Sequence, residues 1–450
     1  MLNRRSFLTA LGSAPLAAAQ PNKPNTLFIL IDDLRYDALG CLGHPWLKTP
    51  NIDRIAKEGV IFRNAFVTTP LCSPSRASFM SGRWAQSHGI KSNGNNAELS
   101  HQLVSFSMLQ QKAGYETAYI GKLHMGNDDS PRPGFDHWVS FKGQGVYQNP
   151  SINVNGKSAV QEGFMTDLLN EHAVKYLKQP RSKPFSLYFA HKAVHGPFTP
   201  PDRHRELYAD AEIIRHPNAQ DDLQGKPALQ REVPVDSKKN PGQVRGGPPN
   251  ETIRNQLRLM QAVDEGVGEI LKLLEETRQL DHTLIIFTSD NGYFHGDHGL
   301  GDKRAAYEES LRIPFLARYP AWFKAGSTND AVILNVDIAP TMMEIAGAKL
   351  PLNVRGKSLM PLFRGKATAV RPDFYCEYFE EAGFPRIPTW HAVRTDRWKY
   401  IEYPSNAAWA ELYDLKADPY EMKNLVAEPV ARAEKKKLQA RLARLKRETM

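Results

Sequence analysis

Cysteine is scarce in this chain of 450 residues, which contains only Cys41, Cys72 and Cys376. An odd number of widely separated cysteines argues against the disulfide framework that stabilises many small exported proteins. A chain of this length can bury a large hydrophobic core and does not need such cross-links. We therefore expect one of the three thiols to have a chemical role.

Long hydrophobic runs are also absent beyond the first 20 residues. No later segment reaches the ~18 apolar residues of a transmembrane helix, which argues against stable insertion into a membrane. Residues 1–19 have two arginines, then an apolar stretch, then small residues, and this pattern predicts an export signal. The Arg4–Arg5 pair, followed by Phe7 and Leu8, is typical of a bacterial twin-arginine signal. The alternatives are an ordinary signal or a retained anchor. We expect an exported bacterial protein, periplasmic or extracellular.

Positive charge is concentrated in one place, although the net charge of the chain is +9. Residues 430–450 hold eight Lys or Arg and two Glu, a net +6, and Arg4 and Arg5 add +2. The body of the chain is therefore close to neutral. No basic patch with interleaved aromatic residues is present, which argues against nucleic-acid binding. We interpret the basic C-terminal segment as a solvated helix face.

What the chain does contain is a series of short apolar runs that end in polar residues. They are TLFILIDD, ending at Asp32 and Asp33; ETAYIGKLH, ending at Lys122 and His124; FSLYFAHKAVH, ending at His191 and His195; and LIIFTSDNG, ending at Asp290 and Asn291. Helical periodicity occurs between such runs and is clearest at residues 253–274. Strands that alternate with helices predict an α/β fold with a mostly parallel sheet flanked by helices. Ligands bind beyond the carboxyl ends of the strands in such sheets, so we expect the four polar ends to converge on one crevice.

The pattern changes after residue 365. Short aromatic segments such as PDFYCEYFEE and TWHAVRTDRWKYIEY follow one another without long helices, which predicts a smaller antiparallel sheet closed by the basic terminal helix. We therefore divide the mature chain into a main domain at 22–365 and a C-terminal subdomain at 366–450. Residues 209–250 are polar and rich in Pro, Gly and Gln. We interpret them as a long surface excursion, either a binding loop or disordered.

The stretch LCSPSRASFMSGR, residues 71–83, combines a thiol with the signals of a short helix. Pro74 suits a first helical turn and Gly82 suits a helix end, so Cys72 is expected at the helix N-terminus. Unpaired backbone N–H groups at that position favour an anion, and Arg76 adds a positive charge one turn into the helix. The segment is predicted to be an anion site that contains a reactive residue.

These motifs resemble those of the type I sulfatases. CSPSRASFMSG is similar to that family's Cys-x-Pro-x-Arg signature, with Met80 and Ser81 where the family has Leu and Thr, and GYETAYIGKLH at 114–124 is similar to a second signature. The resemblance extends from TLFILIDD through TSDNG and GLGDK to ELYDLKADPYEMKNL, and so covers nearly the whole mature chain. It implies an alkaline-phosphatase-like fold in which residues 22–365 form the catalytic domain.

For Cys72 the resemblance implies a covalent conversion. In this family a separate formylglycine-generating enzyme oxidises the cysteine to the aldehyde formylglycine. One hydroxyl of the hydrated aldehyde attacks the sulfur of a sulfate ester, and the other then loses its proton and expels sulfate. This is nucleophilic catalysis with a built-in release step. An inert buried thiol is the alternative interpretation of Cys72.

The expected metal site consists of hard oxygen donors at two strand ends. The donors are Asp32, Asp33, Asp290 and Asn291, joined by the hydrated residue 72. Oxygen-only ligation suits Ca²⁺ or Mg²⁺ better than zinc, and the resemblance favours one Ca²⁺. An Asp–Asp pair after a strand is by itself more typical of a turn or a helix cap. Its combination with SDNG at a second strand end favours the metal site.

Three cations complete the expected sulfate site. By their motif positions, Arg76, Lys122 and Lys303 are expected around the sulfate oxygens. Sulfate-ester cleavage spreads negative charge over those oxygens, so preorganised cations stabilise the transition state. Taken alone, each of the three would be interpreted as a solvated surface charge.

Histidines are expected to transfer protons, because their pKa lies near neutrality. By resemblance, His195 in HGP protonates the leaving alcohol and His124 takes a proton during sulfate release, with exchanged roles as an alternative. We assign His88 and His298 as substrate contacts. His191 is interpreted as a core or loop histidine.

The sequence therefore predicts a formylglycine-dependent sulfatase that acts on sulfated glycans. GDHGLGDKRAAYEESLRIPFL and AVRTDRWKYIEY resemble the carbohydrate sulfatases related to N-acetylglucosamine-6-sulfatase and iduronate-2-sulfatase. Alternatives within the superfamily are an arylsulfatase and a phosphonate monoester or phosphodiester hydrolase. An alternative of another class is an inactive glycan-binding protein, whose signature would be the loss of metal ligands or of the modified cysteine.

Overall fold

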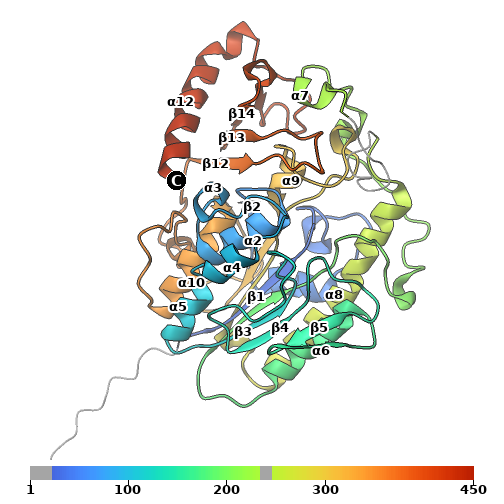
Figure 1. The fold of residues 1–450 in the computed structure, drawn as a ribbon, viewed down its shortest axis with the longest axis vertical. Coiled ribbons are helices and arrows are strands. Elements are labelled where there is room, and N and C mark those ends of the chain that lie inside the picture. The colour runs from blue at the N-terminus through green and yellow to red at the C-terminus, as the bar shows by residue number, and fades with distance from the viewer. Residues whose placement is uncertain (1–22, 234–245) are drawn as a thin grey trace, which may run out of the picture.

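A computed structural model describes residues 23–233 and 246–450. Within them, an 11-stranded sheet has the order β11-β2-β10-β8-β1-β7-β3-β4-β5-β6, with β9 paired to β2 (Figure 1). Its strands are β1 (Asn25–Ile31), β2 (Val60–Phe66), β3 (Glu116–Gly121), β4 (His137–Ser140), β5 (Ser151–Val154), β6 (Lys157–Val160), β7 (Phe185–Ala190), β8 (Thr283–Ser289), β9 (Arg312–Ile313), β10 (Phe315–Arg318) and β11 (Ser327–Leu334). The expected export signal at 1–19 lies outside the described residues.

The central strand β1 lies between two parallel neighbours. It pairs with β7 up to Ala190 and with β8 up to Ser289, so the three strands end side by side. β3 and β4 continue the parallel pairing beyond β7, whereas β10, β5 and β6 pair antiparallel with their neighbours. The predicted α/β fold with a mostly parallel sheet is confirmed, and its parallel part carries the polar strand ends.

Helices cover both faces of the large sheet (Figure 1). The helices of one face are α1 (Pro50–Lys57), α6 (Met165–Leu177) and α8 (Asn250–Glu276), and those of the other are α2 (Cys72–Ser81), α5 (Phe106–Lys112) and α10 (Ile338–Ala346). Alternate residues of β1 point to opposite faces. Leu27 and Ile29 belong to the hydrophobic cluster of the first face, and Phe28 and Leu30 belong to that of the second. Burial on both faces explains why the parallel strands are almost continuously apolar.

The helix predicted from the periodicity at 253–274 is confirmed by α8. Apolar residues at helical spacing, such as Leu257, Met260 and Leu271, are buried in the cluster that α8 shares with α1 and α6. Shorter helices are α3 (Ala85–His88), α4 (Ala97–Gln102), α7 (Pro227–Gln230), α9 (Glu308–Leu311) and α11 (Met360–Phe363). No helix among the described residues combines the length and the apolar content needed to cross a membrane.

A second, four-stranded antiparallel sheet follows near the C-terminus, as predicted. It consists of β12 (Asp373–Tyr378), β13 (Trp390–Thr395), β14 (Trp398–Glu402) and β15 (Glu411–Asp414), in that order. The terminal helix α12 (Arg432–Glu448) buries Leu438, Leu442 and Leu445 beside this sheet (Figure 1). Residues of the small sheet belong to the same hydrophobic cluster as Phe28 of β1, so the two sheets share a core. The division at residue 365 stays a prediction.

The polar excursion at 209–250 is packed more closely than its composition suggests. Asn218 and Lys226 are fully buried, and Asn218 donates a hydrogen bond to Glu309 Oε1 over 2.8 Å. Lys226 forms an ion pair of 2.7 Å with Asp221. The described part of the segment is therefore folded against the body, so a purely disordered excursion is wrong for it. Residues 234–245 lie outside the described part.

Candidate active site

The carboxyl ends of β1 and β8 bring the four predicted metal donors together. Ile31 pairs with Ser289 at the ends of these strands, and Asp32, Asp33, Asp290 and Asn291 follow directly. Carboxylate oxygens of the three acids lie within 4.8 Å of one another. Asn291 Nδ2 donates to Asp33 Oδ1 over 2.7 Å, and the backbone N–H of Asp33 donates to Asp290 Oδ1 over 3.1 Å.

The chemistry of this donor group fits a hard divalent cation. All four side chains are buried and offer oxygen, the ligand that Ca²⁺ and Mg²⁺ prefer. The amide oxygen Oδ1 of Asn291 is buried and has no hydrogen-bond partner among the described residues, so it is free to act as a ligand. Burial and the neighbouring charge of Asp32 raise the pKa of Asp290 to about 7. A bound cation would relieve this repulsion.

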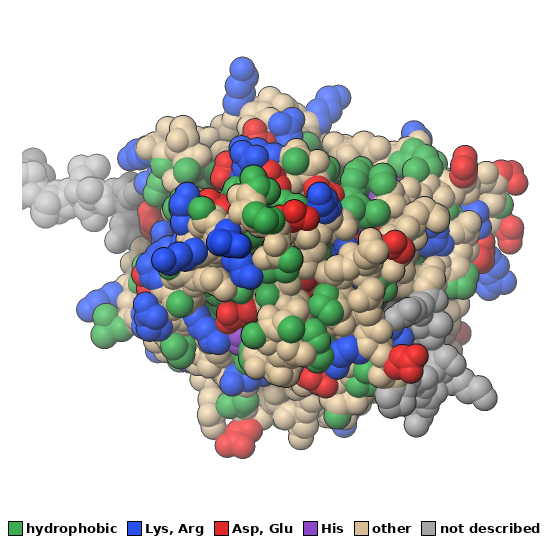
Figure 2. All heavy atoms as spheres, turned by 90° about the horizontal axis from the view of Figure 1, so that it is seen from above, with side chains coloured by type: hydrophobic (Ala, Val, Ile, Leu, Met, Phe, Trp, Pro, Cys, Tyr) green, Lys and Arg blue, Asp and Glu red, His purple; other side chains and the backbone are tan. Residues whose placement is uncertain are grey.

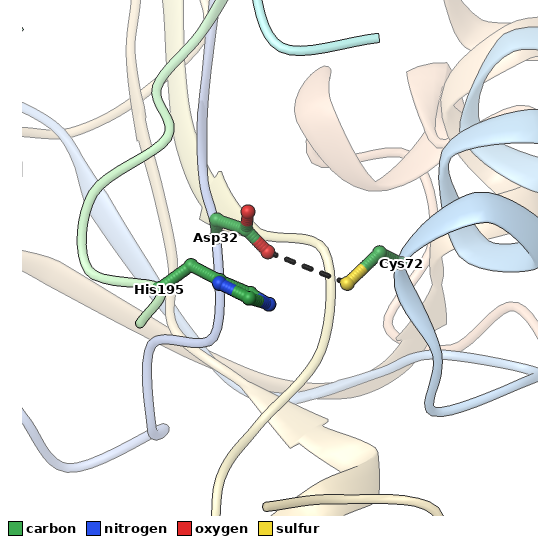
Figure 3. A group of neighbouring side chains, drawn as sticks. All are labelled: Asp32, Cys72 and His195. Carbon is green, nitrogen blue, oxygen red and sulfur yellow. Dashed lines mark hydrogen bonds between the residues drawn. The ribbon is translucent and has the colours of Figure 1, made fainter. Parts of the chain in front are cut away.

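Cys72 is the first residue of α2, as the sequence predicts. The preceding residue Leu71 is extended, and the helix ends at Gly82, whose φ of 70° favours glycine. The thiol Sγ lies 3.5 Å from Asp32 Oδ1, so the helix N-terminus points at the metal donors (Figure 3). Burial raises the pKa of the Cys72 thiol well above its ordinary value, despite the nearby ammonium of Lys303. An unmodified thiol here stays protonated and is a poor nucleophile.

Two buried cations, one on α2 and one after β3 of the large sheet, pair with the acids. Arg76 Nε donates to Asp290 Oδ2 over 2.8 Å, and its NH2 group lies 3.7 Å from Asp32 Oδ2. Lys122, directly after β3, forms an ion pair with Asp32. Burial alone would raise the pKa of Asp32, but the cations around it, Lys122 foremost, hold that pKa well below its usual range. Asp32 is therefore ionised.

Lys303 forms a third ion pair in the same site. Its ammonium lies 2.6 Å from each carboxylate oxygen of Asp33. Burial opposes the charge of Lys303, but the pair with Asp33 keeps its pKa well above the ordinary value. The three predicted cations thus converge with the metal donors, although they come from distant parts of the sequence.

His195 approaches the same acids from the segment after β7 (Figure 3). Its Nε2 lies 3.7 Å from Asp33 Oδ2, and its Nδ1 lies 2.9 Å from the carbonyl oxygen of Gly196. Because a carbonyl only accepts, Nδ1 carries the proton and Nε2 presents a lone pair to the site. Burial, assisted by the charge of Lys122, lowers the pKa of His195 well below its ordinary value. The imidazole is therefore neutral before an anion binds.

His124 lies beside the nucleophile helix. Its carbonyl oxygen accepts a hydrogen bond from the hydroxyl of Ser73, the residue after Cys72. The side chain is buried, and Nδ1 has no hydrogen-bond partner among the described residues. Burial, assisted by Lys122, lowers the pKa of His124 well below its ordinary value. The ring is thus neutral and able to accept a proton.

Lys192 and Tyr147 hold the backbone around His195, and no sequence motif predicts this role for them. The Lys192 ammonium donates to the carbonyl oxygen of Gly196 over 2.9 Å, the same oxygen that accepts from His195 Nδ1. It also lies 4.7 Å from the ring centroid of Tyr147, whose hydroxyl donates to the carbonyl oxygen of His195 over 2.7 Å. Burial and Lys122 lower the pKa of Lys192 to about 7. The only sequence signal is a lysine inside HKAVHGP.

Comparison with known proteins agrees with this geometry. Residues 24–348 match the family model described as Sulfatase, which covers more than half of the chain, and residues 296–448 match the model described as N-sulphoglucosamine sulphohydrolase, C-terminal. The chain belongs to the sulfatase family. A curated N-acetylglucosamine-6-O-sulfatase of Bacteroides thetaiotaomicron is 32% identical to this sulfatase, over 99% of this chain and 91% of the relative. The predicted family, and with it sulfuric ester hydrolase activity, is therefore confirmed.

Solved structures show the same fold. A protein in complex with its substrate D-glucosamine-2-N,6-O-disulfate superimposes on the sulfatase with a TM-score of 0.86 at 30% identity, over 95% of this chain and 98% of the other. A phosphonate monoester hydrolase of Agrobacterium radiobacter gives a TM-score of 0.74 at 21% identity, over 95% of this chain and 96% of the other, which shows a shared fold alone.

The small C-terminal sheet also reaches this active site through the loop after β12. Asn93 Oδ1 accepts a hydrogen bond of 3.0 Å from the backbone N–H of Ser73, next to Cys72. The backbone N–H of Asn93 in turn donates to Glu381 Oε1 over 3.0 Å, and Arg304 Nε donates to Glu381 Oε2 over 2.8 Å. One carboxylate of the C-terminal region thus joins the segment after α2 to Arg304, the residue after Lys303.

The remaining histidines have protein partners or lie in the core. His88 Nε2 lies 3.1 Å from Ser78 Oγ, and His88 Nδ1 accepts from the backbone N–H of Ile90 over 3.1 Å. His298 Nδ1 lies 2.6 Å from Asp221 Oδ2, and its Nε2 lies 3.2 Å from Asn218 Nδ2. Because both rings are buried and fully engaged, these contacts do not support the assignment of His88 and His298 as substrate contacts.

His191 differs from these two histidines. It is fully buried, neither ring nitrogen has a partner among the described residues, and its ring lies 4.3 Å from that of Phe189. This environment agrees with its interpretation as a core histidine.

Proposed function

We propose that this sulfatase hydrolyses sulfate esters of carbohydrates. The Bacteroides relative is named an N-acetylglucosamine-6-O-sulfatase, and the structural neighbour was solved with a disulfated glucosamine as its substrate. The observation that carries the proposal is the convergence of the Cys72 thiol, three carboxylates and three cations in one buried site. Such a site can hold a sulfate ester next to a nucleophile.

We infer that Cys72 is converted to formylglycine by a formylglycine-generating enzyme during maturation. The Cys-x-Pro-x-Arg signature and the high pKa of the buried thiol support this, because the thiol itself would not be ionised at neutral pH. Once formed and hydrated, the aldehyde would supply the nucleophilic oxygen and a second hydroxyl for sulfate release.

The four oxygen donors after β1 and β8 are proposed to hold one Ca²⁺, with Mg²⁺ as the alternative. When bound, the cation would supply Lewis acid chemistry and balance the charge of the acids. Arg76, Lys122 and Lys303 would then bind the sulfate oxygens. Support comes from the NH2 group of Arg76, which has no hydrogen-bond partner among the described residues.

Proton transfer is proposed to rest on His195 and His124. With Nδ1 tied to the Gly196 carbonyl, His195 can take and deliver a proton only at Nε2, which lies near the acids of the site. A bound sulfate anion would favour the protonated ring, which could then donate to the leaving alcohol. His124 Nδ1 has no hydrogen-bond partner within the described part of the chain and lies beside the nucleophile helix, so it would take a proton during sulfate release.

We further propose that the protein is exported and acts on glycans in the periplasm or outside the cell. The support is the signal-like pattern of residues 1–19 and the name of a Drosophila relative, an extracellular sulfatase homologue. Cell fractionation checks this, since export predicts activity outside the cytoplasm. Activity confined to the cytoplasm would contradict it.

The substrate class is tested by comparing kcat/KM on a panel of esters. The panel contains 6-sulfated N-acetylglucosamine, 2-sulfated uronic acid products, nitrophenyl sulfate and a matched phosphonate monoester. We expect a sulfated sugar to be preferred over both nitrophenyl sulfate and the phosphonate monoester. Preference for nitrophenyl sulfate over every sugar would indicate an arylsulfatase, and preference for the phosphonate would indicate the alternative hydrolase.

A further inference from the structure

The exposed face of α12 is a strongly charged surface that the reaction does not use. The helix buries Leu438, Leu442 and Leu445 and turns its basic residues to solvent. Seen from above, Lys and Arg side chains gather on the side of the molecule where α12 lies in Figure 1 (Figure 2). The segment 430–450 carries +6, whereas the body of the chain is close to neutral. A field of one sign on one face attracts a polyanion.

Only part of this charge is compensated by neighbours. Arg441 and Arg444 pair with Asp373, Arg444 also with Glu448, and Lys437 pairs with Glu434. Three further basic residues of α12 form no ion pair within 23–233 and 246–450. They are Arg432, Lys436 and Arg447. Their charges are available to a ligand.

Two neighbouring sets of contacts lead from the C-terminal end of α12 toward the active site. Gln86 Nε2 donates to the carbonyl oxygen of Lys446 over 3.2 Å, and the backbone N–H of Gln86 donates to Glu377 at the end of the small sheet. On the next part of that surface, Lys91 lies 4.9 Å from the ring centroid of Phe379, which lies 6.4 Å from the ring of His391.

Two residues after Lys91 the surface reaches the nucleophile helix. Asn93 bonds both to Ser73 and to Glu381, the residue that also holds Arg304 next to Lys303. The exposed Lys91 therefore lies between the basic helix face and Asn93, which contacts the nucleophile helix.

We propose that the exposed face of α12, continued by Lys91, is a docking surface for the chain of a sulfated polysaccharide whose reacting sulfate enters the active site. The proposal rests on the proposed carbohydrate substrate. A polymer with sulfates at intervals matches a row of cations along a helix of 17 residues, about 25 Å long. A membrane is disfavoured as the partner, because between Arg432 and Arg447 the helix has no large apolar side chain on its exposed face.

Charge-neutralised variants test this surface. The docking variant is R432Q/K436Q/R447Q, and the matched control is K175Q/K178Q/K183Q. The control lysines are exposed and lie in and after α6, at the other end of the molecule (Figure 1). None of the six residues belongs to the catalytic or metal site, so hydrolysis of a sulfated monosaccharide should be unchanged in both variants.

Binding is measured with dextran sulfate as the probe and neutral dextran as its blank. At about 0.1 M salt, loss of three charge contacts should weaken binding of the docking variant about tenfold or more. The difference should shrink at about 1 M salt, where charges are screened within ~3 Å. The control variant should bind like the wild type.

Several results would overturn the proposal. They are equal weakening in both variants, no weakening in either, and tighter wild-type binding to phosphatidylserine vesicles or duplex DNA than to dextran sulfate of matched charge. The binding assay needs no turnover. If no sulfated monosaccharide is hydrolysed, the proposed function fails, and the dextran sulfate measurement still decides whether this surface binds a sulfated chain.

Discussion

Replacing His195 with alanine should separate substrates by their leaving groups. A sugar alkoxide is strongly basic and needs a proton in the transition state, whereas a nitrophenolate leaves without one. The Nε2 of His195 is the ring nitrogen that faces the site, because Nδ1 is held by the Gly196 carbonyl. His195→Ala should therefore damage hydrolysis of sugar sulfates much more than hydrolysis of nitrophenyl sulfate.

The size of the effect follows from the role of the ring. A positioned general acid contributes about 10²–10⁴-fold, which corresponds to about 2.7–5.5 kcal/mol of barrier. Loss of a neutral ring 3.7 Å from Asp33 also changes the site itself, but that change affects both substrates alike. The ratio of the two kcat/KM values, sugar sulfate over nitrophenyl sulfate, should thus fall by about 10²-fold or more.

The assay measures kcat/KM of wild type and variant on both esters. His191→Ala is the matched control, since His191 lies four residues earlier and is buried in the core with no polar partner among the described residues. This control should lower stability and leave the ratio unchanged. An equal loss on both esters in His195→Ala would refute proton delivery by His195.

Three further outcomes are expected. Asp290→Asn removes a charged donor and should lower turnover by about 10²–10³-fold. Elemental analysis of this variant should find less than one bound Ca²⁺ per chain. Full activity of the wild type after exhaustive chelation would contradict a role of the metal in the reaction. Lys192→Met frees the Gly196 carbonyl that orients His195, so it should lower the ratio of kcat/KM for sugar sulfate over nitrophenyl sulfate. In a double-mutant cycle its effect should not add to that of His195→Ala. Strict additivity would contradict the proposal that Lys192 acts through His195. Burial lowers the pKa of His88 and His191 to about 3, below the unfolded value of ~6.5. Their contribution to the free energy of unfolding is therefore complete above about pH 6.5 and declines as pH falls. At pH 5 the free energy of unfolding should be lower by about 2 kcal/mol for each histidine. A thermal midpoint that stays flat between pH 7 and 5 would contradict this.

The main sheet and the reacting residues could be predicted because their signals are local. A buried parallel strand is a short apolar run, and the first polar residues after it must lie at the ligand-binding edge of the sheet. The strand ends predict that Asp32 and Asp290 lie together, although 258 positions separate their neighbours Asp33 and Asn291 in the sequence. The thiol of Cys72 was found from the proline and glycine of its own helix.

Residues that act through the backbone gave no such signal. Lys192 contacts the site only because the chain after β7 turns and brings the Gly196 carbonyl back to its ammonium. His298 was assigned to the substrate from its place in GDHG, but its partners Asp221 and Asn218 come from a segment whose composition indicated an exposed loop. Long-range pairing of buried polar groups decides such positions, and a single sequence does not encode it in spacing or periodicity.

The proposed mechanism depends on an aldehyde nucleophile made from Cys72. Mass spectrometry of the peptide that contains this residue tests it most directly, on protein produced with a formylglycine-generating enzyme and assayed in parallel. We expect formylglycine at position 72, turnover in proportion to the aldehyde fraction, and no turnover in Cys72→Ala. Fully active protein whose Cys72 is alkylated stoichiometrically as a free thiol would contradict it.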